Sequence, residues 1–153
     1  MRKATSSVVF AVAILALLTG CGEGDVYTPV PASAEIPGTW ISTDDDSHTA
    51  TMEFSTDGSV VLSNVPALPL STSQEGEELD WDHTVTTTGT WAEPQDMSSA
   101  YPSILVTLEG QEPPIAYGIH VGVMGEGAKM QLFLYWGNID ADNKLVFSRS
   151  KPE

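Results

Sequence analysis

The sequence is poor in cysteine, in basic residues and in long apolar runs. It has one Cys in 153 residues, so no disulfide can form within the chain. Its 6 Lys and Arg stand against 21 Asp and Glu, which gives a net charge of −15. Proteins that bind the phosphates of nucleic acids, or anionic membranes through a polybasic patch, need a cluster of cations. Such a cluster is lacking here, and both classes are therefore excluded.

The longest apolar run covers residues 8–18 and lies close to the N-terminus. Its length is about half of what a helix needs to cross the hydrocarbon core of a bilayer. Two basic residues, Arg2 and Lys3, precede the run, and small residues follow it. This order is typical of a secretory signal peptide. We therefore expect residues 1–20 to be a signal peptide that is removed.

The apolar run ends at Leu18 and is followed by Thr19, Gly20 and Cys21. Cys21 carries the only thiol of the chain. These residues resemble the lipobox of bacterial lipoprotein precursors, and the chain resembles small lipoproteins of high-GC Gram-positive bacteria. The resemblance implies transfer of a diacylglyceryl group to Cys21 and cleavage before it. Acyl chains of the palmitate type would then hold the protein stably on the bilayer. The expected location is the cell membrane, facing outside the cytoplasm; an ordinary secretory signal with a chance Cys is the alternative.

The mature chain is expected to consist of a tether and a single domain. Loss of residues 1–20 removes two cations and gives a net charge of 4 − 21 = −17. Residues 21–37 hold three prolines among Gly, Ala and Ser, without helix or strand periodicity. We expect a lipidated N-terminus and a flexible tether there, with a reach of about 40–50 Å. The domain is expected over residues 38–153.

The domain has strand patterns and no convincing amphipathic helix. Short segments of β-type are separated by turns and loops, among them a long acidic loop at residues 66–82. The expected strands cover residues 39–42, 49–55, 59–65, 83–91, 102–108, 115–124, 129–136 and 145–149. Eight short strands in succession predict an all-β fold, an antiparallel meander that forms a barrel or a barrel-like sandwich.

A two-residue turn at Glu126 and Gly127 is expected to join the sixth and seventh strands. This register pairs Val123 with Met130, Val121 with Leu132, Ile119 with Leu134 and Tyr117 with Trp136 on one apolar face. On the other face it pairs His120 with Phe133 and Gly118 with Tyr135, so that aromatic rings cover glycines. The seventh strand is then apolar on both faces. Either a loop covers its second face or that face binds a partner.

Gly38, Trp40 and Arg149 resemble the pattern of calycins, the group of lipocalins and avidins. In that group a Gly-x-Trp opens the first strand, and a cation from the last strand packs over the Trp. The resemblance implies that the first and last strands pair and that the Arg149 guanidinium lies within about 6 Å of the Trp40 ring. It also implies an open cup at the other end of the barrel. The alternative is a core Trp40 and a solvated Arg149.

The sequence predicts no catalytic and no cofactor-binding residues. The only thiol belongs to the expected anchor, and a Gly-x-Ser-x-Gly motif is lacking. We expect His48 in a loop, His83 at a strand start and His120 within a strand, each in a structural or half-exposed position.

No metal site is predicted, although three segments of the sequence are rich in acidic residues. Asp44, Asp45 and Asp46 fit a solvated loop. Asp80, Asp82 and His83 would at most hold a divalent ion loosely. Residues 140–143 have a hint of a calcium loop, but they lack its glycine and its bidentate glutamate.

These observations predict a non-catalytic binding or interaction module whose partner is a small apolar ligand or an envelope protein. One alternative is an inhibitor of an extracellular hydrolase that acts through the acidic residues 75–82. A second is a hydrolase that uses a pair of its own carboxylates. An open apolar barrel would favour a ligand, a filled barrel with an ordered loop would favour an inhibitor, and a buried acid pair would favour a hydrolase.

Overall fold

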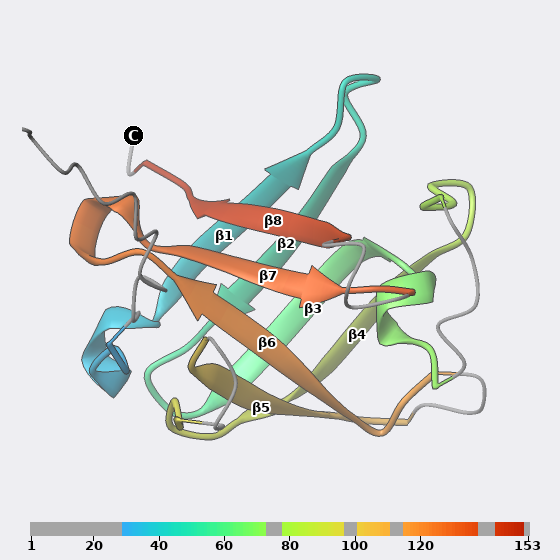
Figure 1. Cartoon of the computed structure of the whole chain (residues 1–153). Helices are drawn as coiled ribbons and strands as arrows, with labels where there is room; N and C mark the ends of the chain where they lie inside the picture. The colour runs from blue at the N-terminus through green and yellow to red at the C-terminus, as the bar shows by residue number, and fades with distance from the viewer. Residues whose placement is uncertain (1–28, 73–77, 97–100, 111–114, 138–142, 152–153) are drawn as a thin grey trace, which may run out of the picture.

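The computed structural model describes residues 29–72, 78–96, 101–110, 115–137 and 143–151. It is a closed barrel of eight antiparallel strands in sequence order (Figure 1). The strands are β1 (Gly38–Thr43), β2 (Thr49–Phe54), β3 (Ser59–Pro66), β4 (Thr84–Trp91), β5 (Ser103–Leu108), β6 (Gly118–Met124), β7 (Gln131–Tyr135) and β8 (Lys144–Arg149). A 3-10 turn, η1 (Ser33–Glu35), precedes β1. Two others, η2 (Leu68–Leu70) and η3 (Gly127–Lys129), lie between β3 and β4 and between β6 and β7. The predicted all-β meander is confirmed.

Within the described residues, none of the helical segments has the length and apolar character that spanning a bilayer requires.

The barrel closes where β1 meets β8. Trp40 pairs with Arg149, and Ile41 pairs with Ser148. The Arg149 guanidinium lies over the Trp40 ring, 4.4 Å from its centroid. This is the contact that was expected between the first and last strands, and it is confirmed. We call this end of the barrel the Trp40 end, and the opposite end, with residues 44–48, 67–72 and 78–83, the loop end.

The inward side chains of all eight strands form one core, because successive residues of a strand alternate between the two faces of the sheet. The largest fully buried side chains of the strands are Trp40, Met52, Leu62, Ile104, Leu108, Leu132, Leu134 and Phe147. At the loop end Leu70 of η2 is fully buried, and Leu79 and Trp81 pack against the same core. Side chains therefore fill the barrel, whereas the calycin resemblance implied an open cup at this end.

The register between β6 and β7 differs from the expected one. Val123 pairs with Leu132, and Gly122 pairs with Phe133. The prediction of a two-residue turn was wrong because η3 lengthens the connection: the Met130 N–H donates to the Gly127 carbonyl at 3.1 Å. Each partner is displaced by two residues, so the faces are preserved. Tyr117, expected on the apolar face, precedes β6 and is 71% exposed.

An aromatic ring still covers a glycine in this hairpin, although the glycine is not the expected one. The ring of Phe133 lies directly over Gly122, in the space that a Cβ atom would need. Phe133 itself is 1% exposed. The absence of a side chain at Gly122 is therefore what lets the ring lie flat on the outside of the barrel.

The part of the chain that packs begins before Gly38. Ile36, which the sequence assigned to the tether, is fully buried, and its carbonyl accepts a 2.9 Å hydrogen bond from the Trp40 indole N–H. The Arg149 guanidinium donates to the carbonyls of Glu35 and Pro37, the latter at 2.9 Å. Residues 29–37 thus lie against the Trp40 end as part of the domain.

Candidate functional site

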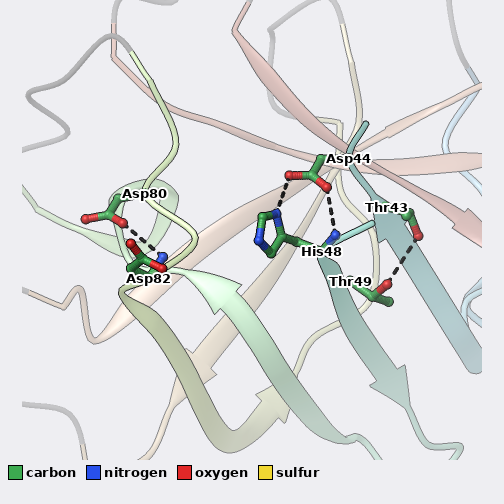
Figure 2. A network of polar contacts seen from close by, with 6 residues as sticks. All are labelled: Thr43, Asp44, His48, Thr49, Asp80 and Asp82. Carbon is green, nitrogen blue, oxygen red and sulfur yellow. Dashed lines mark hydrogen bonds and ion pairs between the residues drawn. The ribbon is translucent and has the colours of Figure 1, made fainter. Parts of the chain in front are cut away.

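Two acidic segments that are far apart in the sequence meet at the loop end. The imidazole of His48, between β1 and β2, stacks on the indole of Trp81, which precedes β4. The ring centroids are 5.4 Å apart and the planes differ by 13°. Figure 2 shows Asp80 and Asp82 on the segment that carries this indole, beside the β1–β2 connection. Local patterning gives no signal for this contact, because the two residues are far apart in the sequence and only the folding of the sheet brings them together.

The β1–β2 connection is held by a single carboxylate. One oxygen of Asp44 accepts a 2.7 Å hydrogen bond from the His48 backbone N–H, and the other lies 2.8 Å from the His48 Nδ1 (Figure 2). The Asp44 N–H donates to the His48 carbonyl at 3.1 Å, and Ser47 has a positive φ of 70°. The loop is thus ordered by its own polar groups, although it projects into solvent.

Electrostatics favour a charged pair in this loop. The hydrogen bond to Asp44 raises the pKa of His48 above its usual value, and attraction by Asp44, Asp46 and Asp82 adds to the increase. Partial loss of water around Asp44 acts to raise the pKa of that carboxyl, but the hydrogen bonds from the His48 side chain and backbone outweigh it. The pKa of Asp44 is therefore lowered.

A second His–Asp pair lies on the neighbouring segment. The Asp80 carboxylate is 2.5 Å from the His83 Nδ1 and also accepts a 2.9 Å hydrogen bond from the Asp82 N–H. The hydrogen bond from His83 is the main reason why the pKa of Asp80 is lowered. The ring of His83 is exposed on the surface just before β4, as its place at a strand start predicted.

Within the described residues, Asp44, Asp46 and His48 form a group of three possible metal ligands. One ligand atom from each lies within 4.8 Å of the others. Carboxylate oxygens and an imidazole nitrogen are donors suited to a divalent transition metal. From the sequence, Asp44 and Asp46 were predicted to belong to a solvated loop. Asp80, Asp82 and His83 were the residues for which loose binding of a divalent ion was considered. An i, i+4 spacing of Asp44 and His48 is the signal that was available.

In the part of the chain that the structure describes, groups of catalytic type are not enclosed. Its buried polar residues are Ser42, Ser71, Thr87 and Ser103, the indole N–H of Trp136 is also buried, and every described carboxylate has contact with water. His120 lies on the outer face of β6, where its Nδ1 is 3.3 Å from the Ser103 hydroxyl. It is an exposed strand histidine with one partner, as was predicted.

The outer face of β7 is covered by residues from two other segments. Phe133 contacts Tyr101 and Tyr135 edge-to-face, with ring centroids 5.3 and 4.9 Å apart. The ammonium of Lys144 lies 4.9–5.3 Å from the centroids of all three rings. This confirms, for Phe133, that neighbouring chain covers the second apolar face of the strand.

Two hollows lie on the described surface, one at each end of β6. One of about 480 Å³ lies at the Trp40 end, between residues 29–31 and the β6–β7 turn at residues 125–127. Another of about 230 Å³ lies where β6 and β7 diverge, and it is lined by Ile119, His120 and Tyr135 among others.

Several sequence predictions fall outside the described residues. They are the signal peptide, Cys21 and its lipobox, the acidic residues Glu75 and Glu77, and Asp140 to Asp142 of the calcium-like segment. Comparison of the chain with protein families, curated proteins and solved structures finds no match in any of the three.

Proposed function

We propose that the chain is a lipid-anchored, non-catalytic interaction module on the outer face of the cell membrane, and that it binds an envelope protein through its loop end. The anchor is Cys21, on the strength of the lipobox from Leu18 to Cys21. The lipid bilayer is then one partner, and the envelope protein is the second.

The filled barrel is the observation that carries this proposal. Trp40, Met52 and Leu132 are fully buried members of the single core inside the barrel, and Leu70 packs against this core at the loop end. A small apolar ligand in the barrel would have to displace part of this core, which costs about 2–5 kcal/mol for one large side chain. A surface that binds a protein needs no such rearrangement.

The loop end offers a preformed polar surface. The hydrogen bonds between His48 and the Asp44 carboxylate order the β1–β2 connection. The stacking of His48 on Trp81 then fixes this connection against the segment before β4, before any partner binds. Prior order lowers the entropy that association costs. The exposed acids beside them, Asp45, Asp46 and Asp82, favour a partner with a basic surface.

Native mass spectrometry of the mature protein, purified from its own cells in mild detergent, tests the proposal. We expect a partner protein to remain bound to the wild type. The double variant Asp46→Asn with Asp82→Asn should lose this partner, whereas the control variant Glu93→Gln, at the opposite end of the barrel, should keep it. A retained small molecule of a few hundred daltons, kept by both variants, would contradict it.

An inhibitor of an extracellular hydrolase is the second candidate, and the same ordered acidic loop favours it. A basic active-site cleft would accept residues 44–48 as a rigid projection. This candidate predicts that the captured partner is a hydrolase, and that the purified module abolishes its activity at equal molar amounts. A hydrolase whose activity is unchanged in the complex would exclude inhibition.

A further inference from the structure

We propose that the Trp40 end of the barrel is a membrane-facing surface that meets the lipid headgroups, and that the loop end points away from the bilayer. This inference rests on the proposed acylation of Cys21. It adds an orientation and a second contact surface to the anchor.

The first argument is the place where the anchored chain enters the domain. Pro29 and Val30 line the hollow of about 480 Å³ beside the β6–β7 turn. Pro31 and Ile36 are buried, and Arg149 donates to the carbonyls of Glu35 and Pro37. The entry point is therefore fixed to the Trp40 end, on the side where η1, η3 and the C-terminal end of β8 lie together (Figure 1).

The second argument is the length of chain between this entry point and the acylated residue. The eight steps from Cys21 to Pro29 span at most about 29 Å when fully extended. A flexible chain of this length has an r.m.s. end-to-end distance of only about 16 Å. The sequence alone had allowed about 40–50 Å, because it counted residues 29–37 as tether.

These lengths disfavour an inverted domain. The strands have five to eight residues and are therefore about 17–26 Å long, so with a tilt of 35–45° the barrel is about 13–20 Å high before its loops are added. With the loops included, the tether would have to stretch beyond its r.m.s. length to bring the loop end to the lipid. The chain entropy therefore favours the Trp40 end as the near surface.

The third argument is the distribution of charge. Lys129, Arg149 and Lys151 are three of the four cations of the mature chain, and all lie at the Trp40 end on the side of Pro29. Glu35 and Glu126 accompany them. The loop end carries more acids within the described residues: Asp44, Asp45, Asp46, Glu78, Asp80, Asp82 and Glu109.

Anionic headgroups attract cations near the surface and repel acids. Lys129 is exposed, and the apolar side chain of Val30 is 38% exposed beside the same turn. The surface formed by Val30, Lys129 and Lys151 is therefore the one that we assign to the headgroup layer. Glu53, Asp57, Glu93 and Asp96 lie at the same end but on the side of β2 to β5, away from η3, so the contact is confined to the η3 side.

Energy transfer from single labels to labelled lipid tests the orientation. The full lipidated protein is placed in phosphatidylcholine vesicles that contain phosphatidylglycerol, with a fluorophore at Ala128→Cys or at Asp45→Cys, both of them exposed positions. We expect several-fold greater transfer from residue 128. Equal transfer from the two positions, or greater transfer from residue 45, would overturn the proposal.

Two controls separate this inference from the proposed anchor. If the parent protein fails to float with the vesicles, the anchor is refuted; if it floats but the labels transfer equally, only the orientation is. Lys129→Glu with Lys151→Glu should reduce transfer from residue 128 in vesicles that contain phosphatidylglycerol, and leave it unchanged in pure phosphatidylcholine. No reduction in the anionic vesicles would overturn the headgroup contact.

Discussion

Removal of the Arg149 side chain should destabilise the barrel far more than the loss of an exposed cation usually does. The guanidinium lies 4.4 Å from the centroid of the fully buried Trp40 ring. It also donates to the carbonyls of Glu35 and Pro37, so one side chain joins β8, β1 and the entering chain.

The magnitude follows from these contacts. A cation over an indole contributes about 0.5–2 kcal/mol, depending on how much water it loses. A hydrogen bond from a charged donor contributes about 1.5–3 kcal/mol when it is buried, and we take about half of that for both bonds together because Arg149 is exposed. Arg149→Ala should therefore lower the free energy of unfolding by about 2–3 kcal/mol, which for a domain of this size lowers Tm by about 8–12 °C.

Urea denaturation of the mature chain, followed by tryptophan fluorescence, measures this change. Arg149→Lys keeps the charge over the ring but cannot reach both carbonyls with a planar fork, so it should cost about 1 kcal/mol. Lys151→Ala removes an exposed cation two residues further on and should change stability by no more than about 0.5 kcal/mol. If Arg149→Ala is no more destabilising than Lys151→Ala, the reasoning about barrel closure is refuted.

Three further predictions concern the anchor, the hairpin and the loop end. Cys21→Ala should release the protein from the membrane fraction or leave an unprocessed precursor, and processed, membrane-bound protein would contradict lipidation. Gly122→Ala should cost about 1–3 kcal/mol in calorimetry because its Cβ meets the Phe133 ring, and the cost should shrink in a Phe133→Leu background; an unchanged cost would exclude the ring as its cause. In NMR titrations His48 should have a midpoint above 6.5, and Asp44→Asn should lower it. Because the pKa of His48 is raised and that of Asp44 is lowered, this pair's stabilisation is full between about pH 4 and pH 6.5. It is lost as pH rises through the folded-state pKa of His48 and as pH falls through that of Asp44, so a pH-independent unfolding difference between wild type and Asp44→Asn would contradict the pair.

The order and type of the strands could be read from the sequence because each strand carries its own pattern. Met52 and Phe54 alternate with polar residues in β2, and Asp57-Gly58 marks the turn that follows. The contact of Trp40 with Arg149 was also accessible, since a closed meander places its first and last strands side by side.

The features that could not be predicted from the sequence depend on backbone detail or on contacts between distant residues. The β6–β7 register was missed because Ala128 and Lys129 read equally well as strand and as part of a 3-10 turn. The stacking of His48 on Trp81 joins segments that are far apart in the sequence and that only the tertiary fold brings together. Residues 29–37 were assigned to the tether because their prolines leave no strand or helix periodicity, so nothing in the pattern indicates that Ile36 is buried.

The closure of β1 on β8 also sets the order in which the chain can fold. The hydrogen bond from Arg149 to Pro37 joins residues 112 positions apart, and such closures are slow because the loop entropy is lost before the contact forms. A chain that emerges N-terminus first, from a ribosome or a translocation pore, has β1 long before it has β8. Until the last strand arrives, the edge of β1 is unpaired and the indole of Trp40 lacks its cover, so the nascent chain is vulnerable to pairing with other chains. Release of residues 144–149 is the step that ends this exposure.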